Sequence, residues 1–144
     1  MATDPRDPDE SYLAFWREPL QCTLTTLRPD GTPHSVPVNV TYDPAAGLAR
    51  VLAGRTSTKV RNILAGQRAA GVPDGTPAGA PVSVSQHAEG GRWATLEGRA
   101  VIRTDPQAVA DGERRSTERY GRTPRENPER VVIEIHLTRA MGRA

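Results

Sequence analysis

Six short runs with β-strand character, separated by turns and brief helical stretches, limit most strongly what this chain can fold into. The runs cover residues 20–27, 32–42, 48–53, 82–87, 92–104 and 130–138. In the last of them Val131, Ile133 and Ile135 occupy alternate positions, as one face of a strand requires. Short strands linked by turns in a chain of 144 residues predict a mainly β fold, namely a small antiparallel barrel of six strands.

The second run carries the clearest signs of a barrel edge. It follows the turn sequence Arg28-Pro29-Asp30-Gly31, in which proline presets φ and glycine accepts a left-handed conformation. Pro33 and Pro37 lie within the run, and proline cannot donate a hydrogen bond to a neighbouring strand. Each proline therefore marks an edge, a bulge or a break, which either turns backbone groups toward a ligand or simply bends the strand.

Helices and irregular segments complete an organisation that we expect to be a single domain over residues 1–144. The helices are expected at residues 10–18, 58–64 and 106–120. Asp9 or Ser11 can cap the first helix, and Asp105 can cap the last. Residues 1–9 are polar and interrupted by proline, so they are predicted to be disordered. Residues 69–80 are rich in glycine and proline and lack hydrophobic periodicity, so they are predicted to form a mobile loop.

The third run leads through a glycine into a loop and a helix that gather hydroxyls and cations. Arg55, Thr56, Ser57 and Lys59 lie at the start of this helix. The first N–H groups of a helix lack backbone partners, so hydroxyls and cations beside them form a ready site for phosphate. Lys59 is the only lysine of the chain, which favours a site that uses a compact point charge. An ordinary capped surface helix with incidental charges would show the same pattern.

The charge pattern argues against nucleic-acid and membrane partners. The 19 basic and 17 acidic residues leave a net charge of +2. The densest group of cations is Arg114, Arg115, Arg119, Arg122 and Arg125. These arginines alternate with glutamates, as is typical of a solvated helix face and loop. No apolar run approaches the length of a membrane span and no apolar targeting segment is present, so we expect a cytoplasmic protein.

The reactive side chains form no pattern typical of a metal centre or a protein nucleophile. His34, His87 and His136 are far apart in the sequence, and none is close to Cys22 at the spacing of a metal site. The single cysteine lies in a β-type run and is predicted to be buried. The serines lack the GxSxG context of a hydrolase. We therefore predict neither a bound metal nor a catalytic side chain.

Four segments, in their order and spacing, carry a resemblance to a known family. They are residues 31–38 (GTPHSVPV), 55–62 (RTSTKVRN), 92–100 (RWATLEGRA) and 123–134 (TPRENPERVVIE). Over residues 12–140 the chain resembles the split-barrel flavin-binding proteins related to pyridoxamine 5'-phosphate oxidase. Within them it is most similar to the actinobacterial deazaflavin-dependent reductases that use coenzyme F-420, especially the biliverdin-reductase-like branch.

The resemblance implies a fold, an assembly and a set of cofactor-binding residues. The fold is a six-stranded antiparallel split β-barrel, the FMN-binding split barrel, with short peripheral helices. The assembly is a homodimer with cofactor sites at the subunit interface. The implied residues are Arg55, Thr56, Ser57, Lys59 and Asn62 for the cofactor's phosphate, Pro37, Val38 and Asn39 for the deazaflavin ring, and Gln86 from the next strand.

The implied function is hydride transfer from reduced F-420, an 8-hydroxy-5-deazaflavin, to a small conjugated acceptor such as biliverdin. Because the cofactor carries the chemistry in such an enzyme, the lack of a protein nucleophile is expected. Two alternatives remain open. One is an FMN-dependent oxidoreductase like pyridoxamine 5'-phosphate oxidase, and the other is a non-catalytic protein that binds a flavin or a haem-like ligand.

Overall fold

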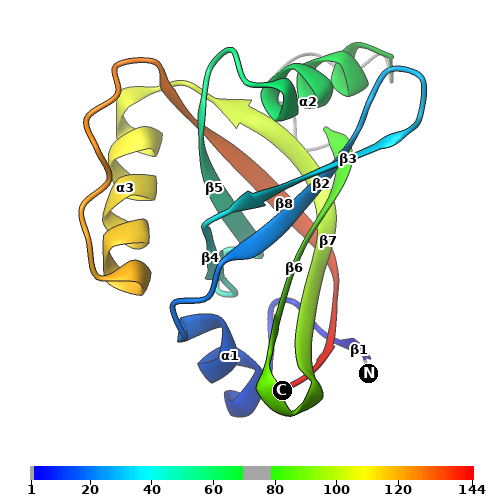
Figure 1. The fold of residues 1–144 in the computed structure, drawn as a ribbon, viewed down its shortest axis with the longest axis vertical. Helices are drawn as coiled ribbons and strands as arrows, with labels where there is room; N and C mark the ends of the chain where they lie inside the picture. The colour runs from blue at the N-terminus through cyan, green and yellow to red at the C-terminus, as the bar shows by residue number, and fades with distance from the viewer. Residues whose placement is uncertain (1, 70–78) are drawn as a thin grey trace.

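The computed structural model of the chain describes residues 2–69 and 79–144, most of which belong to or pack against one antiparallel sheet (Figure 1). The strands are β1 (Ala2–Thr3), β2 (Cys22–Leu27), β3 (Pro33–Val38), β4 (Val40–Asp43), β5 (Leu48–Gly54), β6 (Ala80–Ala88), β7 (Arg92–Arg103) and β8 (Arg130–Arg143). The helices are α1 (Glu10–Arg17), α2 (Thr58–Ala69) and α3 (Pro106–Tyr120), with a turn of 3-10 helix, η1 (Glu89–Gly91), between β6 and β7.

The sheet curls into a barrel because its two edge strands are consecutive in the chain. The strand order is β3-β2-β6-β7-β8-β5-β4, and β1 pairs with β8 outside this path. Only Asn39 separates β3 from β4, so one stretch of backbone belongs to both ends of the order. A twisted sheet whose edges are joined in this way cannot stay open, and Figure 1 shows the resulting curl.

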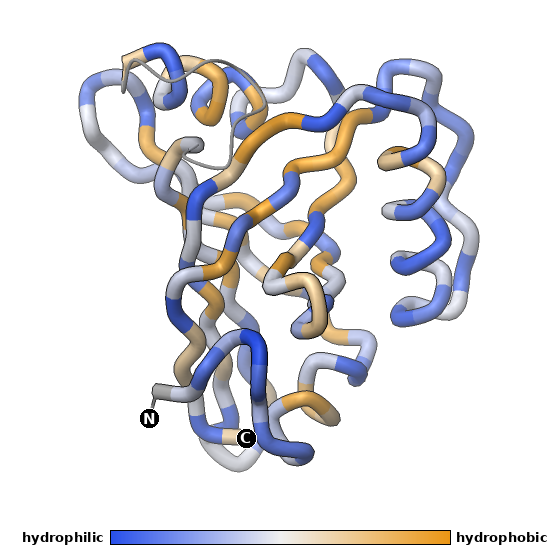
Figure 2. Tube along the Cα trace, turned by 180° about the vertical axis from the view of Figure 1, so that it is seen from behind, coloured by the Kyte–Doolittle hydropathy of each residue, from blue (hydrophilic) through white to orange (hydrophobic). Residues whose placement is uncertain are grey.

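Aliphatic side chains fill the interior of the barrel. Leu24, Leu96 and Ile133, from β2, β7 and β8, are fully buried. Phe15 of α1 and Ile63 of α2 are buried against the same core, so each of these helices covers part of the barrel with its apolar face. In Figure 2 the hydrophobic residues concentrate on the strands, whereas α3 is mostly hydrophilic.

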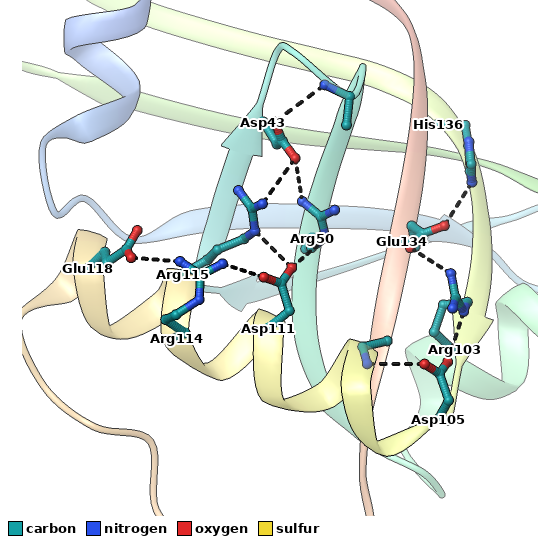
Figure 3. A network of polar contacts seen from close by, with 12 residues as sticks. Asp43, Arg50, Arg103, Asp105, Asp111, Arg114, Arg115, Glu118, Glu134 and His136 are labelled. Carbon is teal, nitrogen blue, oxygen red and sulfur yellow. Dashed lines mark hydrogen bonds and ion pairs between the residues drawn. The ribbon is translucent and has the colours of Figure 1, made fainter.

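Ion pairs bind α3 to the barrel, since few of its residues are apolar. Asp43 of β4 lies 3.0 Å from Arg50 of β5 and 3.4 Å from Arg115 of α3. Asp111 of α3 lies 2.9 Å from Arg115 and 3.8 Å from Arg50. These four side chains alternate in charge across the helix and the two strands (Figure 3). The network therefore fixes α3 against β4, the edge strand that begins directly after Asn39.

The structure confirms the mainly β barrel but has eight strands in the sheet where six were predicted. The predicted run 32–42 is divided at Asn39 into β3 and β4, and β1 adds a further short strand. Pro33 and Pro37 both lie on β3, which pairs with β2 alone, so these prolines mark an edge. The backbone tolerates them there because their missing N–H groups face no partner strand.

The two segments predicted to be irregular have different outcomes. Residues 2–9, for which the sequence predicts disorder, lie along the barrel: Ala2 and Thr3 pair with β8, and the Pro5 carbonyl accepts from the Tyr42 hydroxyl at 2.6 Å. Hydrogen bonds to the main chain do not require apolar side chains at these positions. The polar composition of the segment therefore did not indicate that it would be ordered. Most of the predicted mobile loop 69–80 lies outside the described residues.

The predicted helix starts are confirmed. The Asp9 carboxylate accepts from the Tyr12 amide at 2.9 Å, and that of Asp105 accepts from the Ala108 amide at 3.1 Å. Both are N-cap bonds that satisfy donors of the first helical turn. Within residues 2–69 and 79–144, no helix has the length and hydropathy required to cross a bilayer.

Gly98 is required where the register between β7 and β8 shifts. The shift lies between Glu97 and Gly98, and a Cβ at Gly98 would overlap the His136 carbonyl. We predict that Gly98→Ala lowers the free energy of unfolding by about 1–3 kcal/mol, because the strands must separate to admit the methyl group. Urea denaturation measures this change. Gly54→Ala is the control, since a Cβ there meets no described atom within 4 Å; equal stability of both variants would contradict the prediction.

Candidate functional site

The start of α2 has the geometry of an anion-binding element. The Arg55 amide donates to the Glu129 carbonyl at 2.9 Å, which fixes the preceding loop against the start of β8. The Ser57 carbonyl accepts the first helical hydrogen bond, from the Arg61 amide at 3.1 Å, so Ser57 occupies the N-cap position. Its Oγ is buried and has no hydrogen-bond partner among the described residues. A buried hydroxyl without a partner is costly, and a ligand at the helix start would satisfy it.

Two cationic residues lie on either side of Ser57 in the sequence. Lys59 is half-buried and forms no ion pair with a carboxylate of the described chain. Burial lowers the pKa of Lys59, and a bound anion would offset that effect by favouring the charged ammonium. Arg55 lies 3.3 Å from Glu129, but both side chains are largely exposed, so this pair is weak. With the exposed Thr56 beside them, these residues offer N–H donors, hydroxyls and positive charge to one anion.

Asn62, the remaining predicted phosphate ligand, is tied to the barrel. Its Nδ2 donates to the Thr26 hydroxyl at 3.0 Å, and the side chain is buried. It lines a separate cavity of about 220 Å³ between α2 and the hairpin of β2 and β3. The structure therefore gives Asn62 a role in seating α2, and does not bring its amide nitrogen to Ser57 and Lys59.

Residues 37–39 are the segment predicted to line a cofactor ring. They present mainly backbone atoms and one side chain to a ligand. The Val38 side chain is buried in the core, so only its backbone is available to a ligand. Pro37 is exposed on the outer surface of β3, opposite Thr23. Asn39, at the break between β3 and β4, lines a cavity. Asn39 is thus the member of this group that lines a cavity.

That cavity has a volume of about 510 Å³ and lies between the sheet, α3 and the segment that follows α3. Its walls include Asn39 and Leu52 of the sheet edge, Ser116 and Tyr120 of α3, and Arg122, Arg125 and Arg130 beyond it. Arg130 pairs with Gly54 in the ladder of β8 and β5. Gly54 is followed directly by Arg55, so the pairing of β5 with β8 connects one wall of the cavity to the segment that leads into α2.

The charge pattern assigned the arginine series to a solvated helix face and loop, and it did not reveal that some of these arginines line a cavity. That assignment is correct for Arg114, which pairs with Glu118 at 2.8 Å. It also holds for Arg122 and Arg125, which are exposed in the segment after α3, but these two additionally line the cavity. Gly121 could have indicated this difference. It is the C-cap that ends α3, with a φ of 73°, and arginines beyond the end of a helix cannot form the i,i+4 ion pairs of a helix face.

Gln86 lies in a buried polar cluster away from the start of α2. Its Nε2 donates to the Phe15 carbonyl at 3.1 Å, and its Oε1 accepts from Arg119 at 2.7 Å. The thiol of Cys22, buried as predicted, lies 3.5 Å from the same oxygen. Both ends of the amide are therefore occupied by the protein itself.

Comparison with known proteins assigns the chain to a family. The model of the pyridoxamine 5'-phosphate oxidase family matches residues 8–143, and the chain belongs to this family, whose split barrel the curled sheet represents. A curated relative is an F-420-dependent biliverdin reductase of Mycobacterium tuberculosis (strain CDC 1551 / Oshkosh). It is 42% identical over 135 residues, which cover 94% of this chain and 88% of the relative.

Solved structures share the fold. An F-420 reductase superposes with a TM-score of 0.66 at 23% identity, covering 94% of this chain and 98% of its own. General Stress Protein 26 from Bacillus anthracis str. Sterne superposes with a TM-score of 0.66 at 21% identity, covering 92% of this chain and 91% of its own. At these identities the similarity shows the architecture alone.

The contacts of Gln86 predict a structural effect of its replacement. We expect Gln86→Leu to lower the free energy of unfolding by about 2–3 kcal/mol, because the Phe15 carbonyl loses a donor and Arg119 loses an acceptor. The affinity for F-420, measured by fluorescence titration of the folded variant, should stay within about twofold of the parent. Gln21→Leu, at an exposed position, is the control for stability. Normal stability combined with lost coenzyme binding would place Gln86 in the site instead.

Proposed function

We propose that this protein is an oxidoreductase that uses coenzyme F-420 to reduce a small conjugated acceptor, biliverdin or a similar tetrapyrrole. The observation that carries the proposal is the buried Ser57 hydroxyl at the start of α2, which has no hydrogen-bond partner among residues 2–69 and 79–144, together with Lys59, which forms no ion pair within the same residues. The relative that is 42% identical over nearly the whole chain, an F-420-dependent biliverdin reductase, supports the same coenzyme and acceptor class.

Different residues of the site would bind the phosphate of the coenzyme, its ring and the acceptor. The N–H groups of α2, with Ser57, Lys59 and Arg55, would hold the coenzyme's phosphate, since helix dipole, hydroxyl and cations all favour an anion there. The backbone of residues 37–39 would lie along the deazaflavin ring, and the cavity beyond Asn39 would take the acceptor. When bound, F-420 supplies the hydride, and the chain's own residues orient the two reactants and exclude water.

FMN also carries a phosphate, so the charge at the start of α2 does not by itself distinguish FMN from F-420. Parallel titrations with F-420 and FMN separate the two: the proposal expects quenching of F-420 fluorescence at concentrations where FMN stays free. Purified protein with bound flavin absorbance would favour the FMN-dependent alternative, and a Soret band would favour a haem-binding protein. Turnover with biliverdin then distinguishes an enzyme from a binding protein.

We also propose that the protein acts as a homodimer through the outer face of β2, β3 and β6. The outward positions are Thr23, Thr25, Leu27, Pro33, Ser35, Pro37, Pro81, Ser83, Ser85 and His87. None of these residues is acidic or a lysine or arginine, although 25% of the chain is charged. Depletion of charge is typical of the centre of an interface. Because Pro37 lies on this face, a second copy of the chain bound there would add its own residues beside the segment that lies along the deazaflavin ring.

The role of Lys59 predicts a loss of coenzyme binding without a loss of folding. Lys59→Ala should weaken F-420 binding by about 1.5–3 kcal/mol, roughly ten- to a hundredfold, because a charge-assisted contact to phosphate is removed. The wild-type affinity should fall with added salt and as the pH approaches the ordinary lysine value of about 10.4, since the lowered pKa lets Lys59 lose its proton early. The variant should lack that pH dependence.

Arg68→Ala is the matched control for this variant. It removes one exposed cation from the last turn of the same helix, so F-420 affinity should stay close to that of the parent. Thermal unfolding of both variants establishes that they fold. If Lys59→Ala binds F-420 and FMN as the parent does, the start of α2 is not the phosphate site.

The proposed interface predicts that a charge on it separates the subunits. Ser83→Arg, on the outward face of β6, should convert a dimer to a monomer in sedimentation velocity at micromolar concentration, because like charges would meet in a symmetric contact. The same variant should bind F-420 more weakly, since the partner would no longer complete the site. A wild-type monomer with full coenzyme binding would refute the proposal.

A further inference from the structure

The cavity beside Asn39 concentrates positive charge. Arg122, Arg125 and Arg130 contribute to its lining, whereas no Asp or Glu does. A concave surface lined by one sign of charge focuses the electrostatic potential and attracts ions of the opposite sign. The cavity is therefore suited to an anionic ligand.

Two of the arginines that line the cavity have no carboxylate partner among the described residues, unlike Arg130. Nine arginines lie within ion-pair distance of a carboxylate: Arg17, Arg50, Arg55, Arg92, Arg103, Arg114, Arg115, Arg130 and Arg139. Arg130 belongs to them through Glu113, at 2.6 Å. Arg122 and Arg125 are exposed, and neither pairs with a carboxylate in the described part of the chain. Their guanidinium groups remain available to a ligand.

The remaining walls suit an organic molecule with both apolar and polar groups. Leu52 supplies an apolar surface on the sheet, and Asn39 and Ser116 supply polar groups. The volume of about 510 Å³ lies within the usual range for small-molecule sites. An arginine fork binds a carboxylate through two parallel hydrogen bonds, so Arg122 and Arg125 can each hold one.

We infer that Arg122 and Arg125 form a carboxylate-recognition subsite that selects an acceptor bearing two acidic side chains. The inference rests on the proposed function, which places the coenzyme's phosphate at Ser57 and Lys59 and leaves this cavity to the acceptor. The pairing of Arg130 with Gly54 supports this placement, because Gly54 is three residues before Ser57 in the chain. The carboxylates of a coenzyme tail share the same chemistry, and the experiment separates the two sources.

The test compares biliverdin, which carries two carboxylates, with its dimethyl ester, which carries none. Both are titrated by absorbance into the full chain without coenzyme, so the result does not depend on turnover. The wild type should bind the acid at least about tenfold more tightly than the ester, since a charge-assisted pair contributes that much. Arg122→Gln and Arg125→Gln should each lose part of this preference and the double variant most of it, while all three variants bind the ester as before.

The control and the coenzyme titration complete the design. Arg139→Gln removes an arginine charge from β8, away from the cavity, and should keep the preference for the acid. Affinity for F-420 should be unchanged in the Arg122 and Arg125 variants. If instead they lose F-420 affinity and keep the preference for the acid, the arginines serve the coenzyme tail and the inference is wrong. Equal or absent binding of acid and ester by the wild type also overturns it.

The proposed function can fail separately. If the wild type does not bind F-420 but prefers the acid over the ester through Arg122 and Arg125, the coenzyme assignment is wrong and the carboxylate subsite stands. If F-420 binds and the preference is missing, the coenzyme assignment stands and the subsite does not.

Discussion

The guanidinium group of Arg119 joins the elements on which the candidate site depends. From α3 it donates to the Val40 carbonyl at 2.6 Å, to the Glu18 carbonyl at 2.8 Å and to the Gln86 oxygen at 2.7 Å. These acceptors belong to β4, to the end of α1 and to β6. Charge-assisted hydrogen bonds in a partly buried setting are strong, and here one planar group donates to acceptors on three different elements. Arg119 thereby holds the barrel closed beside Asn39.

The neighbouring Tyr120 fixes the same point and determines where the cavity lies. Its hydroxyl donates to the Leu20 carbonyl at 2.8 Å and accepts from the Val40 amide at 3.1 Å. Burial raises the pKa of Tyr120 to about 12, so the phenol keeps the proton that it donates. Because α3 ends there at Gly121, the chain must run back beside the helix to reach β8 (Figure 1). That return segment carries Arg122 and Arg125 and forms the outer wall of the cavity.

The charges of α3 show why a net charge of +2 says little about this site. Asp105, Arg103, Glu134 and His136 form one chain of polar contacts over the sheet, and the network around Asp111 forms another (Figure 3). Pairing on this scale neutralises most of the arginines near the helix. Lys59, Arg122 and Arg125 pair with no carboxylate of the described residues, so the surface near the site attracts anions although the whole chain is nearly balanced.

The sequence by itself determined the features that depend on neighbouring residues. The alternation of apolar residues marks the strands, prolines mark β3 as an edge, and a carboxylate followed by helix-forming residues marks each cap, because all of these act within a few residues. The cluster of Ser57 and Lys59 at a helix start follows for the same reason. Tertiary structure alone decided that Asn39 divides two strands, that Gln86 is paired with Arg119, and that Arg122 and Arg125 line a cavity. Each of these depends on contacts between segments that are far apart in the sequence, such as the contact of Arg119 with Glu18. No local sequence pattern encodes which distant segments will meet.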